Sequence, residues 1–189
     1  NLRSSTERLA ATRRNAKRAK TTFRRWEATQ AEGITGTEGM MPTEIAALRS
    51  HKAILEHALS EGVECVLILE DDIDFIDNFD ELLNIHMSEL PEDWDGLHLG
   101  GFTQKGGLYQ YSPLLNKSFA TWGGYGYLVS KKVIPLLLET ISEEKMPVDT
   151  YYARLMPKLN WFKTKEMLVR HLPGYSTIQN AHRDHKDLY

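Results

Sequence analysis

The chain has 189 residues, of which 41% are hydrophobic and 26% charged, and this fits one globular domain over residues 1–189. Cys65 is the only cysteine, so an intramolecular disulfide is excluded. No apolar run approaches the roughly 20 residues that a transmembrane helix needs. A lone thiol within an apolar run is compatible with a reducing compartment, and we expect a cytoplasmic protein.

The net charge of −3 hides an asymmetry between the first 30 residues and the rest. Residues 1–30 carry nine Lys/Arg and two acids, for +7, so the remainder carries −10. A basic flank can attract a phosphate-bearing ligand, nucleic acid or an anionic membrane, or it can be a solvated helix face. No nucleic-acid-binding motif accompanies it, so we expect no nucleic-acid partner. Peripheral membrane contact through a basic N-terminal helix stays open.

Helical and strand-like patterns alternate along the first half of the chain. Ser4 and Glu7 have the spacing of a capping box, which predicts a helix from there. Residues 23–28 resemble a short strand. Residues 44–61 have a helical apolar face, with Thr43 as the expected cap and Gly62 at the end. The unalternating aliphatic run at 65–70 is typical of a central parallel strand buried on both faces.

The second half continues the alternation. We expect helices over 78–90, 131–144 and 148–159, and strands within 94–101, 118–130 and 161–169. The tail at 179–189 is polar and predicted to be irregular. Alternating helices and strands predict an α/β fold with a central, mostly parallel sheet.

Four carboxylates follow the aliphatic run, at Glu70, Asp71, Asp72 and Asp74. In open α/β sheets, ligands bind beyond the carboxyl ends of the strands. If the chain turns out of the strand, Glu70 and Asp72 share one side; if the strand continues, Asp72 and Asp74 do. Either pair supplies oxygen ligands suited to Mg²⁺ or Mn²⁺ with substrate phosphates. The alternative is that these acids cap the next helix or face water.

Segments TEIAALRSH (43–51) and LILEDDIDF (67–75) together resemble glycosyltransferase family 25, the lipooligosaccharide and collagen-type galactosyltransferases. Further similarities follow in order at NLRSSTER (1–8), FRRWEAT (23–29), WDGLHLG (94–100), YLVSKKVIPLLLE (127–139) and PVD (147–149). Three departures stand out, and one of them is the tail, which is the least well matched segment. Ala46–Ala47 replace the family's Gly–Cys pair, and the apolar strand expected before Asn1 is absent, so a first strand upstream is expected to be missing.

The resemblance implies a GT-A-like, nucleotide-binding, Rossmann-type sandwich. It also implies an inverting, metal-dependent transfer of a hexose, galactose or glucose, from a UDP-sugar to a glycan, lipid-linked or protein hydroxyl. Its metal ligands for Mn²⁺ or Mg²⁺ are Asp72, supported by Glu70 and Asp71, with a tail histidine, His182 or His185. The implied base is Asp149, although Asp is also a common helix cap. The implied donor-site residues are Asn1, Arg3, Arg8, Glu44, His51, Gly123 and Gly124.

Two other functions are compatible with the acidic run. Asp72-Ile73-Asp74 after an aliphatic strand is similar to the start of a phosphotransferase of the haloacid dehalogenase type, although Phe75 departs from that pattern. A non-catalytic module that binds a nucleotide-sugar or a glycan is the second alternative.

Overall fold

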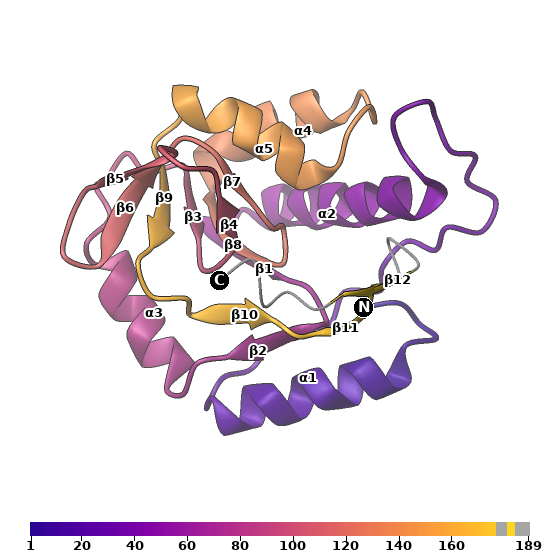
Figure 1. The fold of residues 1–189 in the computed structure, drawn as a ribbon, viewed down its shortest axis with the longest axis horizontal. Helices are drawn as coiled ribbons and strands as arrows, with labels where there is room; N and C mark the ends of the chain where they lie inside the picture. The colour runs from indigo at the N-terminus through magenta and orange to yellow at the C-terminus, as the bar shows by residue number, and fades with distance from the viewer. Residues whose placement is uncertain (177–180, 184–189) are drawn as a thin grey trace.

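Helices and strands are interspersed along the chain, but the alternation that the hydrophobic patterns predict is not observed, because residues 96–130 form six strands in succession (Figure 1). The computed structural model describes residues 1–176 and 181–183, with side chains as far as residue 173. The helices of this part are α1 (Thr6–Arg18), α2 (Pro42–Glu61), α3 (Phe79–Met87), α4 (Ile134–Ile141) and α5 (Val148–Leu155). Its strands are β1 (Cys65–Leu69), β2 (Ile73–Phe75), β3 (Gly96–His98), β4 (Phe102–Thr103), β5 (Leu108–Gln110), β6 (Leu115–Ser118), β7 (Thr121–Trp122), β8 (Gly126–Ser130), β9 (Trp161–Thr164), β10 (Val169–His171), β11 (Gly174–Ser176) and β12 (Ala181–Arg183).

Two predicted helix caps are wrong. Helix α1 has Ser5 at its N-cap, without a side-chain capping bond. Helix α2 begins at Pro42, since proline suits the first helical position, and Thr43 therefore lies inside the first turn. The backbone N–H of Met41 donates to Glu44 Oε2 at 2.8 Å, so the Glu44 carboxylate caps this helix.

The prediction of a mostly parallel sheet is wrong. The central sheet has the order β1-β8-β3-β9-β6-β5, and in the described part of the chain only β3 and β9 pair in parallel. Strand β8 lies between β1 and β3 and runs opposite to both. An aliphatic run indicates burial on both faces, but it carries no information on the direction of the neighbouring strand. The α/β class itself is confirmed.

Strand β1 lies at the edge of this sheet rather than at its centre. A groove of about 410 Å³ runs along its outer edge, and of the five β1 residues only Ile68 is buried. Residues 23–28, on the other side of the groove, do not form the predicted strand. Their backbone instead bonds to Asn1, with Asn1 N to Trp26 O at 3.2 Å and Ala28 N to Asn1 O at 3.0 Å.

Two apolar cores cover the two faces of the sheet. Side chains alternate along a strand, so Tyr127 and Val129 of β8 enter one core and Leu128 enters the other. Helices α2, α4 and α5 pack on the first face, while α1 and α3 contribute to the second core (Figure 1). The sheet is therefore the middle of three layers.

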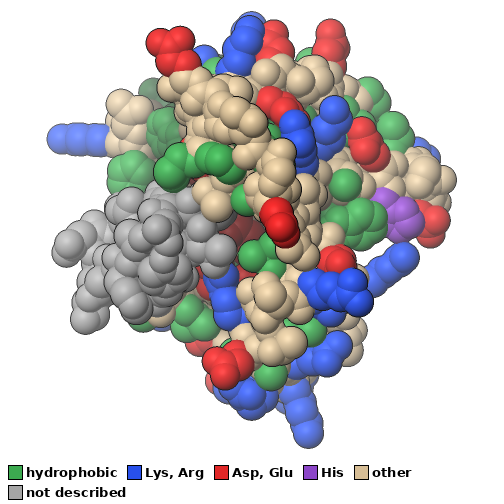
Figure 2. All heavy atoms as spheres, turned by 90° about the vertical axis from the view of Figure 1, so that its right-hand side faces the viewer, with side chains coloured by type: hydrophobic (Ala, Val, Ile, Leu, Met, Phe, Trp, Pro, Cys, Tyr) green, Lys and Arg blue, Asp and Glu red, His purple; other side chains and the backbone are tan. Residues whose placement is uncertain are grey.

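Helix α1 holds β2 through its side chains. Thr12 Oγ1 donates to Asp71 O at 2.9 Å, and Asn15 Nδ2 donates to Ile73 O at 3.2 Å. Arg18 continues the series to Phe75 O at 2.6 Å. The carbonyl groups of Asp71, Ile73 and Phe75 therefore accept hydrogen bonds from side chains of α1. The other side of α1 carries exposed basic residues, and Figure 2 shows Lys and Arg side chains along the lower part of the face it displays.

Replacing Gly96 with alanine should destabilise the fold. A Cβ atom there would lie 2.5 Å from ring atoms of the fully buried Trp161. Overpacking of this kind costs about 1–3 kcal/mol. The matched control is Glu56→Ala on the exposed face of α2, expected to change stability by less than about 0.5 kcal/mol. Chemical denaturation measures both, and equal midpoints for Gly96→Ala and the wild type would contradict this packing.

Candidate active site

The acidic run turns out of β1 and enters β2. Glu70 still bonds to the sheet, with its N–H donating to Tyr125 O at 2.9 Å. Strand β2 then pairs antiparallel with β10, so that Ile73 faces His171. The pairing extends beyond the strands, since Leu172 N donates to Asp72 O at 2.7 Å. It places the His171 imidazole beside the Asp72 carboxylate.

Glu70, Asp72 and His171 form a cluster that suits a metal ion. One ligand atom from each residue lies within 4.8 Å of the others. Asp72 Oδ1 is buried and has no hydrogen-bond partner among the described residues. A buried carboxylate oxygen without a partner is costly, and a cation would supply one. Two carboxylates and an imidazole therefore fit a divalent ion here.

Basic and amide groups compensate the neighbouring carboxylates. Arg8 of α1 pairs with Asp71 at 3.0 Å and also with Asp72. Asn1 Nδ2 donates to Asp71 Oδ2 at 2.6 Å. Burial alone would raise the pKa of Asp72, but the His171 hydrogen bond and the charges of His171 and Arg8 hold it below its ordinary value. Asp72 therefore stays ionised beside its acidic neighbours.

A pocket of about 190 Å³ opens beside this cluster. Small side chains of α2 and of the loop before it form much of its wall. Its lining residues are Leu2, Arg8, Ala28, Thr29, Ala31, Thr43, Ala46, Ala47, Ser50, His51, Glu70, Asp71, Asp72 and His171. The Ala46–Ala47 pair, a departure from the family pattern, thus lies in the wall of this pocket.

The dipeptide Gly123–Gly124 links Asp149 to the acidic cluster. The Gly123 N–H, at φ +105°, donates to Asp149 Oδ2 at 3.1 Å. A Cβ atom on Gly124 would lie 3.8 Å from both Glu70 Oε1 and His51 Cε1, so this backbone passes directly against both side chains. Asp149 lies in the first turn of α5, after the N-cap Pro147, rather than at the cap. The Gly123–Gly124 backbone therefore lies between Asp149 on one side and Glu70 on the other.

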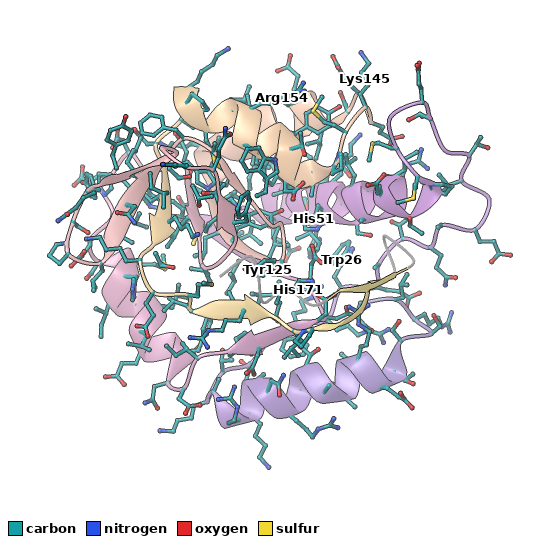
Figure 3. The ribbon with its side chains drawn as sticks, viewed as in Figure 1. Trp26, His51, Tyr125, Lys145, Arg154 and His171 are labelled. Carbon is teal, nitrogen blue, oxygen red and sulfur yellow. The ribbon has the colours of Figure 1, made fainter. Side chains whose placement is uncertain are left out.

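His51 faces the cluster from α2. Its Nε2 atom lies 3.7 Å from Glu70 Oε1, and its Nδ1 atom lies 2.8 Å from Tyr127 Oη. Figure 3 shows His51 above Tyr125 and His171 in the middle of the molecule, between α2 and the β2–β10 pair. The Tyr125 and His171 rings meet edge to face at 5.4 Å.

Two sequence-predicted residues that the structure describes, Glu44 and Arg3, do not join this cluster. Glu44 caps α2, as described above, and Arg3 is exposed and lies outside the pocket lining. His182 belongs to β12, where it is the register partner of Tyr175, but its side chain lies outside the described part of the chain. His185 also lies outside the described residues.

His171 was missed by sequence reasoning. The last predicted strand stops at residue 169, and a single histidine after it has no local pattern that indicates a site. Only the β2–β10 pairing brings it to Asp72. Tyr127 likewise has no local sequence signal beyond its place in the segment 127–139 that resembles the family.

The sequence pattern of glycosyltransferase family 25 (LPS biosynthesis protein) matches residues 1–105, more than half of the chain. The chain belongs to glycosyltransferase family 25. The match covers the acidic run and His51, and membership supports a glycosyltransferase that uses a sugar donor and a glycan acceptor. Comparison with curated proteins found no match. In the described part of this family 25 chain, no helix is long and apolar enough to cross a membrane.

Replacing His171 with glutamine should flatten the dependence of stability on pH near neutrality, in protein kept metal-free by a chelator. Burial lowers the pKa of His171, but its hydrogen bond to Asp72 outweighs this and raises it. Such a group stabilises the fold fully below its unfolded pKa, ordinarily 6.5, and that contribution is lost as pH rises through the folded value.

Thermal unfolding across this pH range measures the effect. His57→Gln is the matched control, because His57 lies against Trp26, at 5.2 Å between ring centres, outside the acidic cluster. An unchanged pH slope in His171→Gln would mean that the His171–Asp72 contact does not stabilise the fold.

Proposed function

We propose that this chain transfers a hexose, galactose or glucose, from a UDP-sugar to a hydroxyl acceptor, with inversion and with the help of a divalent cation. Family membership supports glycosyl transfer, and the acidic cluster beside a pocket supports a site for a diphosphate. The observation that carries the proposal is the Gly123–Gly124 dipeptide, which bonds Asp149 and packs against Glu70. This backbone would hold the proposed base near the proposed cation site.

The cation would be held by Glu70, Asp72 and His171. Mg²⁺ prefers oxygen ligands in octahedral geometry, whereas an imidazole in the set favours a softer ion, so Mn²⁺ suits this cluster better. When bound, such an ion neutralises charge on the diphosphate as the sugar bond breaks. Asp71, which bonds to Asn1 and Arg8, would support the cluster without binding the ion.

The donor would lie in the pocket beside the cluster. Ala28, Ala46 and Ala47 leave room along its wall, which suits a nucleoside. Arg8 lines the same pocket and already pairs with carboxylates. A guanidinium group also binds phosphate oxygens, so Arg8 is the residue that would contact the diphosphate.

Asp149 would act as the base. As the acceptor oxygen attacks the anomeric carbon, the Asp149 carboxylate takes the hydroxyl proton. The new carbon–oxygen bond forms on the face opposite the diphosphate, the bond from that carbon to the phosphate oxygen breaks, and the nucleoside diphosphate leaves. The Gly123 N–H holds Asp149 Oδ2 in place for this role.

Purified protein should hydrolyse or transfer sugar from a UDP-hexose in the presence of Mn²⁺, and Asp72→Asn should abolish this. Removing a charged ligand weakens the cation site, so we expect at least about a tenfold loss of Mn²⁺ affinity. Asp74→Asn is the matched control within the same acidic run. Asp74 pairs with Arg18 and not with the cluster, so this variant should keep its activity.

A screen of UDP-sugars with and without Mn²⁺, Mg²⁺ and a chelator measures these activities. No stimulation by either ion with any such donor would contradict the proposal. Release of phosphate from a generic ester without a nucleotide-sugar would favour the phosphotransferase, and binding of a donor without turnover would favour a binding module.

Asp149→Asn should lower turnover by about 10²–10⁴-fold, the usual contribution of a general base, while UDP-sugar binding changes little. The amide can still accept the Gly123 N–H bond, so the backbone there should hold. Asp80→Asn is the control, because Asp80 also lies in the first turn of a helix, α3, and is exposed. Steady-state kinetics with calorimetric donor binding separates the two effects, and near-normal turnover in Asp149→Asn would exclude this residue as the base.

A further inference from the structure

A buried series of hydrogen-bonding groups runs from α5 to the acidic cluster. Tyr152 Oη lies 3.3 Å from Tyr127 Oη, which lies 2.8 Å from His51 Nδ1. The other ring nitrogen of His51 lies 3.7 Å from Glu70 Oε1. Tyr127 and Tyr152 are fully buried and His51 is 5% exposed, so these groups depend on one another for partners.

The ends of this series determine which group donates to which. Burial raises the pKa of both tyrosines above the ordinary value, so both hydroxyl groups keep their protons. Tyr152 Oη has Tyr127 as its only hydrogen-bond partner among the described residues. Tyr152 therefore donates to Tyr127, and Tyr127 donates to His51 Nδ1.

A ring nitrogen that accepts a hydrogen bond cannot carry the proton of a neutral imidazole, so that proton resides on His51 Nε2. The Nε2–H group then faces the Glu70 carboxylate. The reverse direction would leave the buried Tyr152 proton without an acceptor in the described part of the chain, at a cost of about 1–3 kcal/mol. It would also point the Nε2 lone pair at a carboxylate oxygen.

We propose that Tyr127 and Tyr152 are positioning residues, which fix the tautomer of His51 so that its Nε2–H orients Glu70 for the cation. This inference rests on the proposed role of Glu70 in holding that cation. Tyr152 lies three residues after Asp149, on the same face of α5. The series therefore also ties the helix that carries Asp149 to the segment that carries Glu70.

Tyr127→Phe tests the proposal, because it removes the hydroxyl group and keeps the ring. In metal-free protein, ¹⁵N–¹H NMR of the imidazoles should show His51 as the Nε2–H tautomer in the wild type and as a mixture with Nδ1–H in the variant. Mn²⁺ affinity, measured by calorimetry, should fall by about 10-fold or more, as when outer partners of metal ligands are removed.

Tyr151→Phe is the matched control. It makes the same change on the same helix, but the Tyr151 hydroxyl accepts from the Lys145 N–H at 2.9 Å and takes no part in the series. Both the His51 tautomer and the Mn²⁺ affinity should therefore stay as in the wild type. Tyr152→Phe removes the first donor only, and we expect a smaller shift of the tautomer than in Tyr127→Phe.

An Nδ1–H tautomer in the wild type would overturn the proposal, and so would an unchanged tautomer in both Tyr127→Phe and Tyr152→Phe. If Tyr127→Phe does not fold, the wild-type spectrum and Tyr152→Phe decide. If the wild type binds no Mn²⁺, the cation dependence of the proposed function is contradicted. The tautomer spectra still test the positioning in that case, so the two failures are distinguishable.

Discussion

The site depends on the hydrogen bonding of β2 along both of its edges. Strand β10 pairs with one edge, and side chains of α1 donate to alternate carbonyls at Asp71, Ile73 and Phe75 along the other. Buried backbone groups need such partners, so the segment that carries the acids is confined to one position. The same two neighbours supply Arg8 and His171, the basic groups beside Asp72.

The repulsion among adjacent carboxylates is tolerated because each one has polar or basic partners, with Arg8 shared by Asp71 and Asp72. His51 lies beside Glu70, Asn1 and Arg8 bond to Asp71, and Arg8 and His171 contact Asp72. The turn out of β1 separates the side chains so that these groups can reach them. Among the described residues one buried oxygen of Asp72 lacks a hydrogen-bond partner, so a cluster with partly compensated charge suits a cation.

The features of the fold that depend on local hydrophobic patterns could be predicted from the sequence. The α/β class and the approximate positions of the helices follow from apolar periodicity, because each helix must bury one stripe of its own sequence. The direction and order of the strands were not predictable. Strand β8 pairs with β1 and β3, which lie far from it in the sequence. An aliphatic run such as that of β1 is compatible with a strand at the edge of a sheet as well as with one at its centre.

For the site, the acidic run at the end of β1, the family resemblance and the candidates Asp72, His51 and Asp149 can all be identified from the sequence. Which residues come together depends on the tertiary structure. His171 lies beside Asp72 because of a strand pair between distant segments, and the Gly123–Gly124 backbone lies between Asp149 and Glu70. The sequence states which side chains are present. The distance between residues that are far apart in the chain depends on strand pairing and packing, and no local pattern indicates these.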